Sequence, residues 1–214
     1  MSKTLYWGYI DREGEMVVEP GFDDAGDFHE GLAMVKVDWR RGFIDREGNY
    51  AIEPQFQAAG DFVEGLARVM DDDRWGYIDQ EGKYVIEPQF EQADDFHEGL
   101  ARVKSGDEWI FVDRTGMKVG DAPEKAETER WANDAALSPS LAGDEYGYAD
   151  REGIMVIEPK YCEAGPFREG LARVKQTANG KWGYITEEGK YAFKDKFKQA
   201  GDFSEGRARV LVEE

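Results

Sequence analysis

Residues 75–101, WGYIDQEGKYVIEPQFEQADDFHEGLA, hold one complete copy of a pattern that the chain repeats. The opening Trp-Gly-Tyr-Ile-Asp, or a close variant, begins at residues 7, 41, 75, 109, 146 and 182, at steps of 34, 34, 34, 37 and 36 residues. A second marker, Phe-x-Glu-Gly-Leu-Ala, keeps the same phase at 28–33, 62–67, 96–101 and 167–172, and at 203–208 with Arg207 in place of Leu. Self-similarity at such a period is typical of repeat architectures, in which neighbouring units complete each other's core.

Within one copy the side chains alternate with a period of two, which favours strands over helices. Trp75 and Tyr77 alternate with small or aliphatic residues, and residues 83–87 resume the pattern after a Gln80-Glu81-Gly82 break. β-branched and aromatic residues dominate both runs, as they do in strands. An Asp that opens a type I turn and a Gly that closes it predict a three-residue hairpin loop with a bulge. Each unit is therefore expected to begin with a β-hairpin.

The rest of the copy predicts two further features. Glu87-Pro88 ends the second strand, because proline cannot donate to a ladder. Residues 90–96 turn the chain, with a brief strand of their own. The next strand is expected to place Ala101 and Val103 toward the core and Arg102 toward water. Because this strand leads into the next Trp-Gly strand, the chain is predicted to be an all-β antiparallel meander.

The six copies fill the chain as a single repeat domain, 1–214. The units run over approximately 5–38, 39–72, 73–106, 107–143, 144–179 and 180–214. We favour an open superhelical, solenoid-like array, because a repeat of ~34 residues is short beside the ~40–45 residues of a four-stranded propeller blade. The alternative is a closed, propeller-like ring, in which the two ends of the chain pair and remove their exposed edges.

Unit four departs from the pattern. An insertion around residues 121–134 includes a stretch, 121–131, of helix-forming composition with Pro123 near its start. Such an insertion projects from one face of an array and is a common place for function. Drift in a unit whose packing is supplied by its neighbours is the plainer interpretation.

These residues resemble the WG repeat of bacterial proteins. Trp-Gly-Tyr-Ile-Asp, the Asp-x-Glu-Gly turn, Glu-Pro and Phe-x-Glu-Gly-Leu-Ala together carry the resemblance, which covers nearly the full chain. It implies a repeat domain used for binding or scaffolding, with no catalytic residues to carry over. The departures are Arg41 for the Trp of unit two, Ile110 for the Gly of unit four, and Lys194-Asp195 for Glu-Pro in unit six.

Charge and composition narrow the class of partner. The 214 residues include 27 basic and 46 acidic ones, a net charge of −19, and 28 aromatic residues argue against a disordered tail. A general nucleic-acid binder or a binder of anionic membranes needs a basic footprint, so neither is expected. With one cysteine and no long apolar run, the sequence predicts a soluble cytoplasmic protein. The acidity is concentrated in residues 1–108, which have 11 basic and 26 acidic residues.

No catalytic constellation is evident, so we expect no enzyme activity, cofactor or metal. The two histidines, His29 and His97, lie two units apart, whereas zinc takes three or four protein ligands. The recurrent carboxylates have a simpler explanation, in which each Asp caps its own turn and each Glu holds the bend before its own strand. The recurrent Trp7, Trp75, Trp109 and Trp182 are expected in the core, stacking between units, with the adjacent Gly allowing close backbone approach.

Residues outside the repeat pattern are the candidates for partner binding. Trp39, with Arg40 and Arg41, lies in a predicted turn and is of a type enriched at interface hot spots. The acidic candidates lie in loops, and Trp131 is likewise out of register. The complete set is Trp39, Arg40, Arg41, Asp71, Asp72, Asp73, Asp94, Asp95 and Trp131.

Three functions fit these residues. The leading hypothesis is a non-catalytic protein-binding module whose acidic surface engages a basic protein partner. The first alternative is an inhibitor or immunity-type protein that blocks a basic effector such as a nuclease. The second alternative is a small-ligand, glycan-like binding module that uses the repeat tryptophans. A small lysine patch at Lys190, Lys194, Lys196 and Lys198 leaves self-association open.

Overall fold

The computed structural model describes residues 5–122, 137–151 and 153–213, which form 23 β-strands and no helix. The described residues therefore contain no helix that is long and apolar enough to cross a membrane. The chain divides into two compact units: unit 1 comprises Met1–Phe22 and Arg130–Glu214, and unit 2 comprises Asp23–Glu129. The predicted all-β repeat fold is confirmed, and every described sheet is open, with two edge strands.

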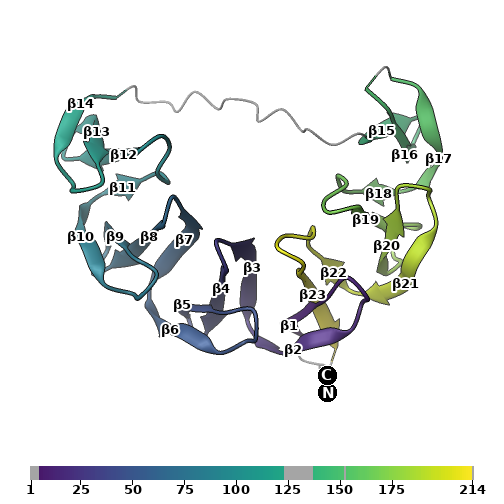
Figure 1. The fold of residues 1–214 in the computed structure, drawn as a ribbon, viewed down its shortest axis with the longest axis horizontal. Helices are drawn as coiled ribbons and strands as arrows, with labels where there is room; N and C mark the ends of the chain where they lie inside the picture. The colour runs from purple at the N-terminus through teal and green to yellow at the C-terminus, as the bar shows by residue number, and fades with distance from the viewer. Residues whose placement is uncertain (1–4, 123–136, 152, 214) are drawn as a thin grey trace. The chain divides into compact units, whose positions relative to one another are not determined.

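Unit 2 contains three four-stranded antiparallel sheets that follow one another along the chain (Figure 1). The first has β3 (Asp24–His29), β4 (Leu32–Val37), β5 (Arg40–Ile44) and β6 (Tyr50–Phe56); the second has β7 (Ala58–Val63), β8 (Leu66–Asp71), β9 (Arg74–Ile78) and β10 (Tyr84–Phe90); the third has β11 (Gln92–Ala93), β12 (Leu100–Ser105), β13 (Glu108–Asp113) and β14 (Lys118–Asp121).

Unit 1 contains two sheets with this order and one with three described strands. The strands are β15 (Ser138–Ala142), β16 (Glu145–Ala149) and β17 (Met155–Tyr161); β18 (Glu163–Ala164), β19 (Leu171–Lys175), β20 (Trp182–Thr186) and β21 (Tyr191–Phe197); and β22 (Gln199–Ala200), β23 (Ala208–Glu213), β1 (Leu5–Ile10) and β2 (Met16–Phe22).

The sheets are out of phase with the sequence repeat by half a unit. A sequence copy begins at the Trp-Gly strand, whereas a sheet begins at the short strand after Glu-Pro, so each sheet takes two strands from one copy and two from the next. The predicted hairpins across the repeat boundaries are thereby confirmed, as is the brief strand expected within 90–96. The predicted insertion at 121–134 lies mostly outside the described residues; Asp121 ends β14.

The same offset joins the two ends of the chain within unit 1. β1 pairs with β23 over six residues, from Leu5 opposite Glu213 to Ile10 opposite Ala208. The last copy supplies only β22 and β23 to its sheet, and the first copy supplies β1 and β2. Pairing of the ends, which the sequence linked to the ring alternative, therefore satisfies the two edges that the half-unit offset would otherwise leave open.

The Asp-x-Glu-Gly turns form as predicted. Asp79 Oδ1 accepts hydrogen bonds from the backbone N–H of Glu81 (3.1 Å) and of Lys83 (2.9 Å), and Gly82 N donates to Asp79 O (3.0 Å). Gly82 has a φ of +79°, in the left-handed region that glycine adopts at no steric cost. Asp11, Asp45 and Asp113 bind their own turns in the same way.

The glycine of Trp-Gly is required by the proline of Glu-Pro. A Cβ on Gly76 would lie 2.5 Å from Ile86 O and 2.7 Å from Pro88 N. β10 bulges toward Gly76 at this point, because the register of its pairing with β9 shifts between Ile86 and Phe90. The two motifs of the sequence therefore make one contact, and the predicted close backbone approach is confirmed.

The core lies between successive sheets. Tyr77 of β9 and Phe96 of the next sheet are both buried, with ring centroids 4.8 Å apart and ring planes at 67° to each other. The corresponding pairs are Phe43–Phe62, Tyr148–Phe167 and Tyr184–Phe203. The Tyr77 hydroxyl also donates to Asp94 O of the next sheet (2.7 Å). Each sheet thus buries its apolar face only because another sheet follows it.

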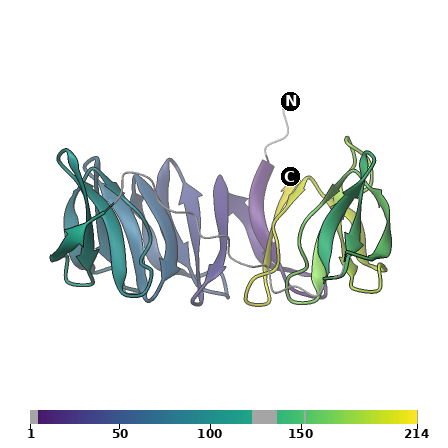
Figure 2. The same cartoon turned by 90° about the horizontal axis from the view of Figure 1, so that it is seen from above.

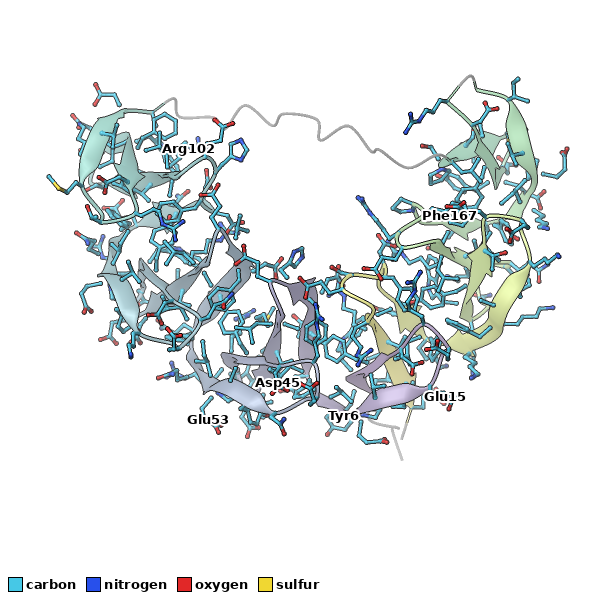
Figure 3. The ribbon with its side chains drawn as sticks, viewed as in Figure 1. Tyr6, Glu15, Asp45, Glu53, Arg102 and Phe167 are labelled. Atoms are coloured by element: carbon cyan, nitrogen blue, oxygen red, sulfur yellow. The ribbon has the colours of Figure 1, made fainter. Side chains whose placement is uncertain are left out.

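Three expectations about side chains are wrong. The recurrent tryptophans are only partly buried and do not stack on one another: the guanidinium of an arginine on the adjacent strand covers each ring, as Arg102 covers Trp109 at 4.1 Å. Arg102, labelled in Figure 3 beside the β11–β14 sheet, accordingly does not face water. Its side chain is 12% exposed. The third error concerns the repeated glutamates. Glu64 accepts hydrogen bonds from Glu98 N (2.6 Å) and Gly99 N (2.9 Å) in the next sheet instead of holding its own bend.

Gly76→Ala should lower the free energy of unfolding by about 1–3 kcal/mol, the usual cost of forcing extra atoms into a well-packed interior. The reason is the clash with Ile86 O and Pro88 N, because neither backbone atom can move without breaking the bulge. The check is the urea midpoint and melting temperature. Gly21→Ala is the matched control, since nothing lies within 4 Å of its Cβ. Equal stability of the two variants would contradict the packing argument.

Candidate partner-binding surface

Two tight turns of unit 2 present most of the candidate residues that the sequence singled out. Residues 38–39 join β4 to β5, and residues 72–73 join β8 to β9, the second and third strands of consecutive sheets. Both turns join the second and third strands of their sheets, and Figure 2 shows the strands of unit 2 running between turns at their two ends. We call Asp38, Trp39, Asp71, Asp72 and Asp73 the acidic turn surface.

Both turns have a left-handed backbone at their two central residues. The φ angles are +48° and +69° at Asp38 and Trp39, and +46° and +59° at Asp72 and Asp73. This is the geometry of the two-residue type I′ turn, which matches the twist of the flanking strands. Aspartate tolerates it, but a bulky residue such as Trp39 rarely adopts it. Trp39 nevertheless occupies the tip with 82% of its surface exposed.

Side chains that lie just before the first strand of each sheet hold the two turns in place. Asp38 N donates to Asp23 Oδ2 (3.0 Å), and Asp73 N donates to Gln57 Oε1 (2.9 Å). Gln57 Nε2 in turn donates to Asp73 Oδ1 (3.1 Å). Because their backbone groups are bonded in this way, the turns present Trp39 and the aspartates in a pre-organised arrangement.

Trp39 borders a shallow hollow of about 330 Å³ that Asp23, Lys36 and Asp38 also line. The Lys36 ammonium lies 4.7 Å from the Trp39 ring centroid, within the range of a cation–π contact. The ring is thus already held from one side by a cation of its own chain. Trp39 is the large exposed apolar side chain of this surface, and it lies in a turn, as the sequence predicts.

A second hollow, of about 270 Å³, lies beside the 72–73 turn. Its lining residues are Asp71, Asp72, Arg74, Tyr84, Glu87 and Pro88. Tyr84 donates its hydroxyl hydrogen to Asp71 Oδ2 at 3.0 Å. Burial and the Asp71 carboxylate together raise the pKa of Tyr84 to about 12. The sequence gives no signal for Tyr84 as a site residue, because a tyrosine at this position is part of the ordinary strand alternation.

The aspartates of the surface are uncompensated. Within the described part of the chain, no ion pair involves Asp38, Asp71, Asp72 or Asp73. Residues 23–122 include 24 acidic and 11 basic residues, against 16 and 13 in the described residues of unit 1. Negative potential is therefore concentrated on unit 2.

The two arginines next to Trp39 serve the scaffold. Arg40 Nη1 donates to Gln55 O (3.0 Å) and Arg41 Nη1 donates to Gln57 O (2.5 Å). Arg41, which replaces the tryptophan of its copy, therefore ties its strand to the segment that leads into the next sheet. Arg40 and Arg41 follow Trp39 directly in the chain, but their Nη1 groups donate hydrogen bonds to backbone carbonyls.

Asp94 and Asp95 lie away from the acidic turn surface and pair with arginines. Arg102 Nε donates to Asp94 Oδ2 (2.7 Å), and Arg68 Nε lies 3.0 Å from Asp95 Oδ1. Arg68 also donates to Ala93 O of the next sheet (2.7 Å). Arg173 in unit 1 repeats this brace with Asp202 and Ala200 O. The last candidate, Trp131, lies outside the described residues.

These repeated sheets, turns and braces define an all-β repeat protein, and the comparisons give its family. The family described as WG containing repeat matches residues 7–38, 42–75, 75–109, 146–182 and 182–214. The chain belongs to this WG-repeat family, which confirms the resemblance. The matched segments leave out residues 110–145, the part of the chain that includes the irregular unit four.

Solved structures with similar arrangements are distant in sequence. A protein of unknown function from Bacteroides caccae is 13% identical, with 90% of this chain and 93% of that chain covered and a TM-score of 0.30. Virginiamycin B lyase from Staphylococcus aureus is 11% identical, with 92% and 75% covered and a TM-score of 0.35. No curated protein matches the sequence.

Asp71→Asn should lower the pKa of Tyr84 from about 12 toward the ordinary tyrosine value, because it removes the negative charge that opposes ionisation of the phenol. The check is an NMR titration of the ¹³Cζ signals of the tyrosines between pH 9 and 13. Asp72→Asn is the comparison variant and should lower the pKa of Tyr84 less, since Asp72 acts on the phenol through its charge alone and makes no hydrogen bond to it. An unchanged Tyr84 titration in Asp71→Asn would contradict the pair.

Proposed function

We propose that this WG-repeat chain is a non-catalytic protein-binding module that engages a basic protein partner through the acidic turn surface. The observation that carries the proposal is Trp39, held at a φ of +69° and 82% exposed beside aspartates that have no ion-pair partner. Tryptophan is among the residues that dominate binding energy at protein interfaces.

The charge supports a basic partner. An exposed negative surface attracts a positive one over a Debye length and accelerates association. The fixed turns add to this effect, because pre-organised groups lose little conformational freedom on binding. We also propose a cytoplasmic location, for which the single cysteine is suitable.

The repeat tryptophans lend less support to a glycan-like binding module. Arginines of adjacent strands cover Trp7, Trp75, Trp109 and Trp182, with the guanidinium carbons 4.1–5.5 Å from the ring centroids. A sugar would have to displace an arginine in order to stack on such a face. We therefore place the binding function on Trp39 and not on the repeat positions.

The test is capture of partners from the native host's lysate at about 0.05 and 0.15 M salt, with identification by mass spectrometry. Replacing Asp71, Asp72 and Asp73 together by Asn should reduce recovery of a basic partner about tenfold at low salt and flatten its salt dependence. Trp39→Ala should reduce affinity by about thirtyfold, which corresponds to the ~2 kcal/mol of a hot-spot residue.

The matched control replaces Glu13, Glu47 and Glu81 by Gln. It removes the same number of charges from equivalent positions of three Asp-x-Glu-Gly turns, whose side chains make no ion pair within the described ranges. Recovery of the partner should stay the same in this control. If both triple variants lose the partner equally, net charge and not the acidic turn surface is responsible, and the proposal is wrong. The activity of the recovered partner would separate scaffolding from inhibition.

A further inference from the structure

The hollow beside Trp39 already holds a cation of its own chain. Lys36 of β4 places its ammonium 4.7 Å from the Trp39 ring centroid, and Asp23 and Asp38 line the same hollow. We call these four residues the Trp39 hollow. An aromatic face beside carboxylates attracts cationic side chains, because both components interact favourably with positive charge. Lys36 therefore shows which chemical class of group the hollow accepts.

The contact between Lys36 and Trp39 is weakly held. In the described ranges of the chain, the Lys36 ammonium makes no ion pair and no hydrogen bond besides this contact. The ring is 82% exposed, and a cation–π contact at an exposed site is a weak interaction. Lys36 can therefore leave the ring without breaking another bond, and the ring can then accept a different cation.

The repeat tryptophans show how the same chemistry is satisfied by an arginine. Each of them has a guanidinium over its ring, and Arg102 over Trp109 is the closest of the four, at 4.1 Å. Arg102 Nε also donates to Asp94 Oδ2 (2.7 Å). One arginine thus contacts an aromatic face and a carboxylate at once, because its guanidinium is planar, stacks on rings and has donors at its edge.

The Trp39 hollow offers the same two components to a guanidinium. Asp23 and Asp38 supply carboxylates beside the ring, and neither makes an ion pair with another residue that the structure describes. Lys36 uses this site incompletely, because a compact ammonium has no plane to stack on the ring. An arginine from another molecule would fit the hollow better than the lysine that now occupies it.

Within unit 2 this combination belongs to the 38–39 turn. The next sheet has Asp73 in the place of Trp39 and Met70 in the place of Lys36. The third sheet keeps a lysine, Lys104, but has Asp107 at the turn position. The sequence thus places a tryptophan and a lysine together at one of the three corresponding turns.

We propose that the Trp39 hollow binds an arginine side chain of the basic partner. The guanidinium displaces Lys36 from the ring and pairs with the carboxylates of Asp23 and Asp38. This inference rests on the proposed function and adds to it the residue type that the partner presents. Lys36 acts as a tethered competitor, so the affinity for arginine is reduced in proportion to the fraction of molecules in which the ring is free.

The test is an NMR titration of the full chain at about 0.15 M salt with two blocked peptides of equal charge, hexa-arginine and hexa-lysine. The backbone signals of Asp38 and Asp72 report binding, and the ring-current shift of the Lys36 Hε protons reports displacement. The arginine peptide should bind about fivefold more tightly, since it can both stack and pair, and should remove the shift from Lys36. In Trp39→Ala the two peptides should bind equally.

Lys36→Met should increase the affinity for the arginine peptide about threefold, because it removes the competitor. Methionine fits this strand, since Met70 occupies the corresponding position of β8. Lys104→Met is the matched control. It removes the same charge from the corresponding position of β12, where the turn has no tryptophan, and should leave the affinity unchanged.

The proposed function and the arginine site fail in different ways. If neither peptide shifts signals of the acidic turn surface, this surface does not bind basic chains, and both proposals are wrong. If the peptides bind equally, or if Lys36 keeps its ring-current shift when the arginine peptide is bound, the arginine site alone is overturned. Equal gains in affinity in Lys36→Met and Lys104→Met would also overturn it, because net charge would then explain both.

Discussion

The fold depends on the burial of each sheet's apolar face against the next sheet. No sheet has a core of its own, since the buried aromatic rings of one sheet interlock with those of the following one, as Tyr77 does with Phe96. Burial of such aromatic side chains is the dominant favourable term in folding. A single copy of the repeat would leave this surface in water. The requirement for a neighbouring sheet explains why the unit is repeated and why the same kinds of side chain recur at the junctions.

Polar groups link each sheet to the sheet that follows it. A tyrosine hydroxyl, an arginine and a glutamate of one sheet each bond to groups of the next sheet, as Tyr77, Arg68 and Glu64 do. Glu64 occupies a left-handed turn position where asparagine or glycine is more usual, with a φ of +54°. Its carboxylate explains the choice, because it reaches two backbone N–H groups that the next turn cannot satisfy alone. These charge-assisted bonds fix the sheets in one register.

The candidate binding features occur where the sequence departs from the repeat pattern. At the 38–39 turn the scaffold needs only a two-residue loop, and the chain places a tryptophan there. In the β11–β14 sheet, Ile110 and Ala122 stand in place of the glycine and the proline that meet in other sheets, and Ala122 N donates to Trp109 O, a bond that a proline could not make. The departure at the 38–39 turn leaves the packing of Phe43 against Phe62 of the next sheet in place, so we propose that Trp39 serves binding and not folding.

Sequence periodicity alone determined the all-β repeat class, the hairpins, the Asp-x-Glu-Gly turns and the close approach at Trp-Gly. These features depend on residues that lie near one another in the chain. The type of each residue, such as glycine or proline, is enough to indicate the backbone conformation that it adopts there. The partners of Glu64, Arg68 and Asp95 could not be found in this way, since they lie in a neighbouring sheet. Alternation also cannot tell a solvent-facing arginine from one stacked on tryptophan. Tertiary structure also decided the half-unit offset that pairs β1 with β23. The physical reason is that strands pair where their apolar faces can be buried and their edge hydrogen bonds can be made. This position need not coincide with the residue at which the sequence motif begins.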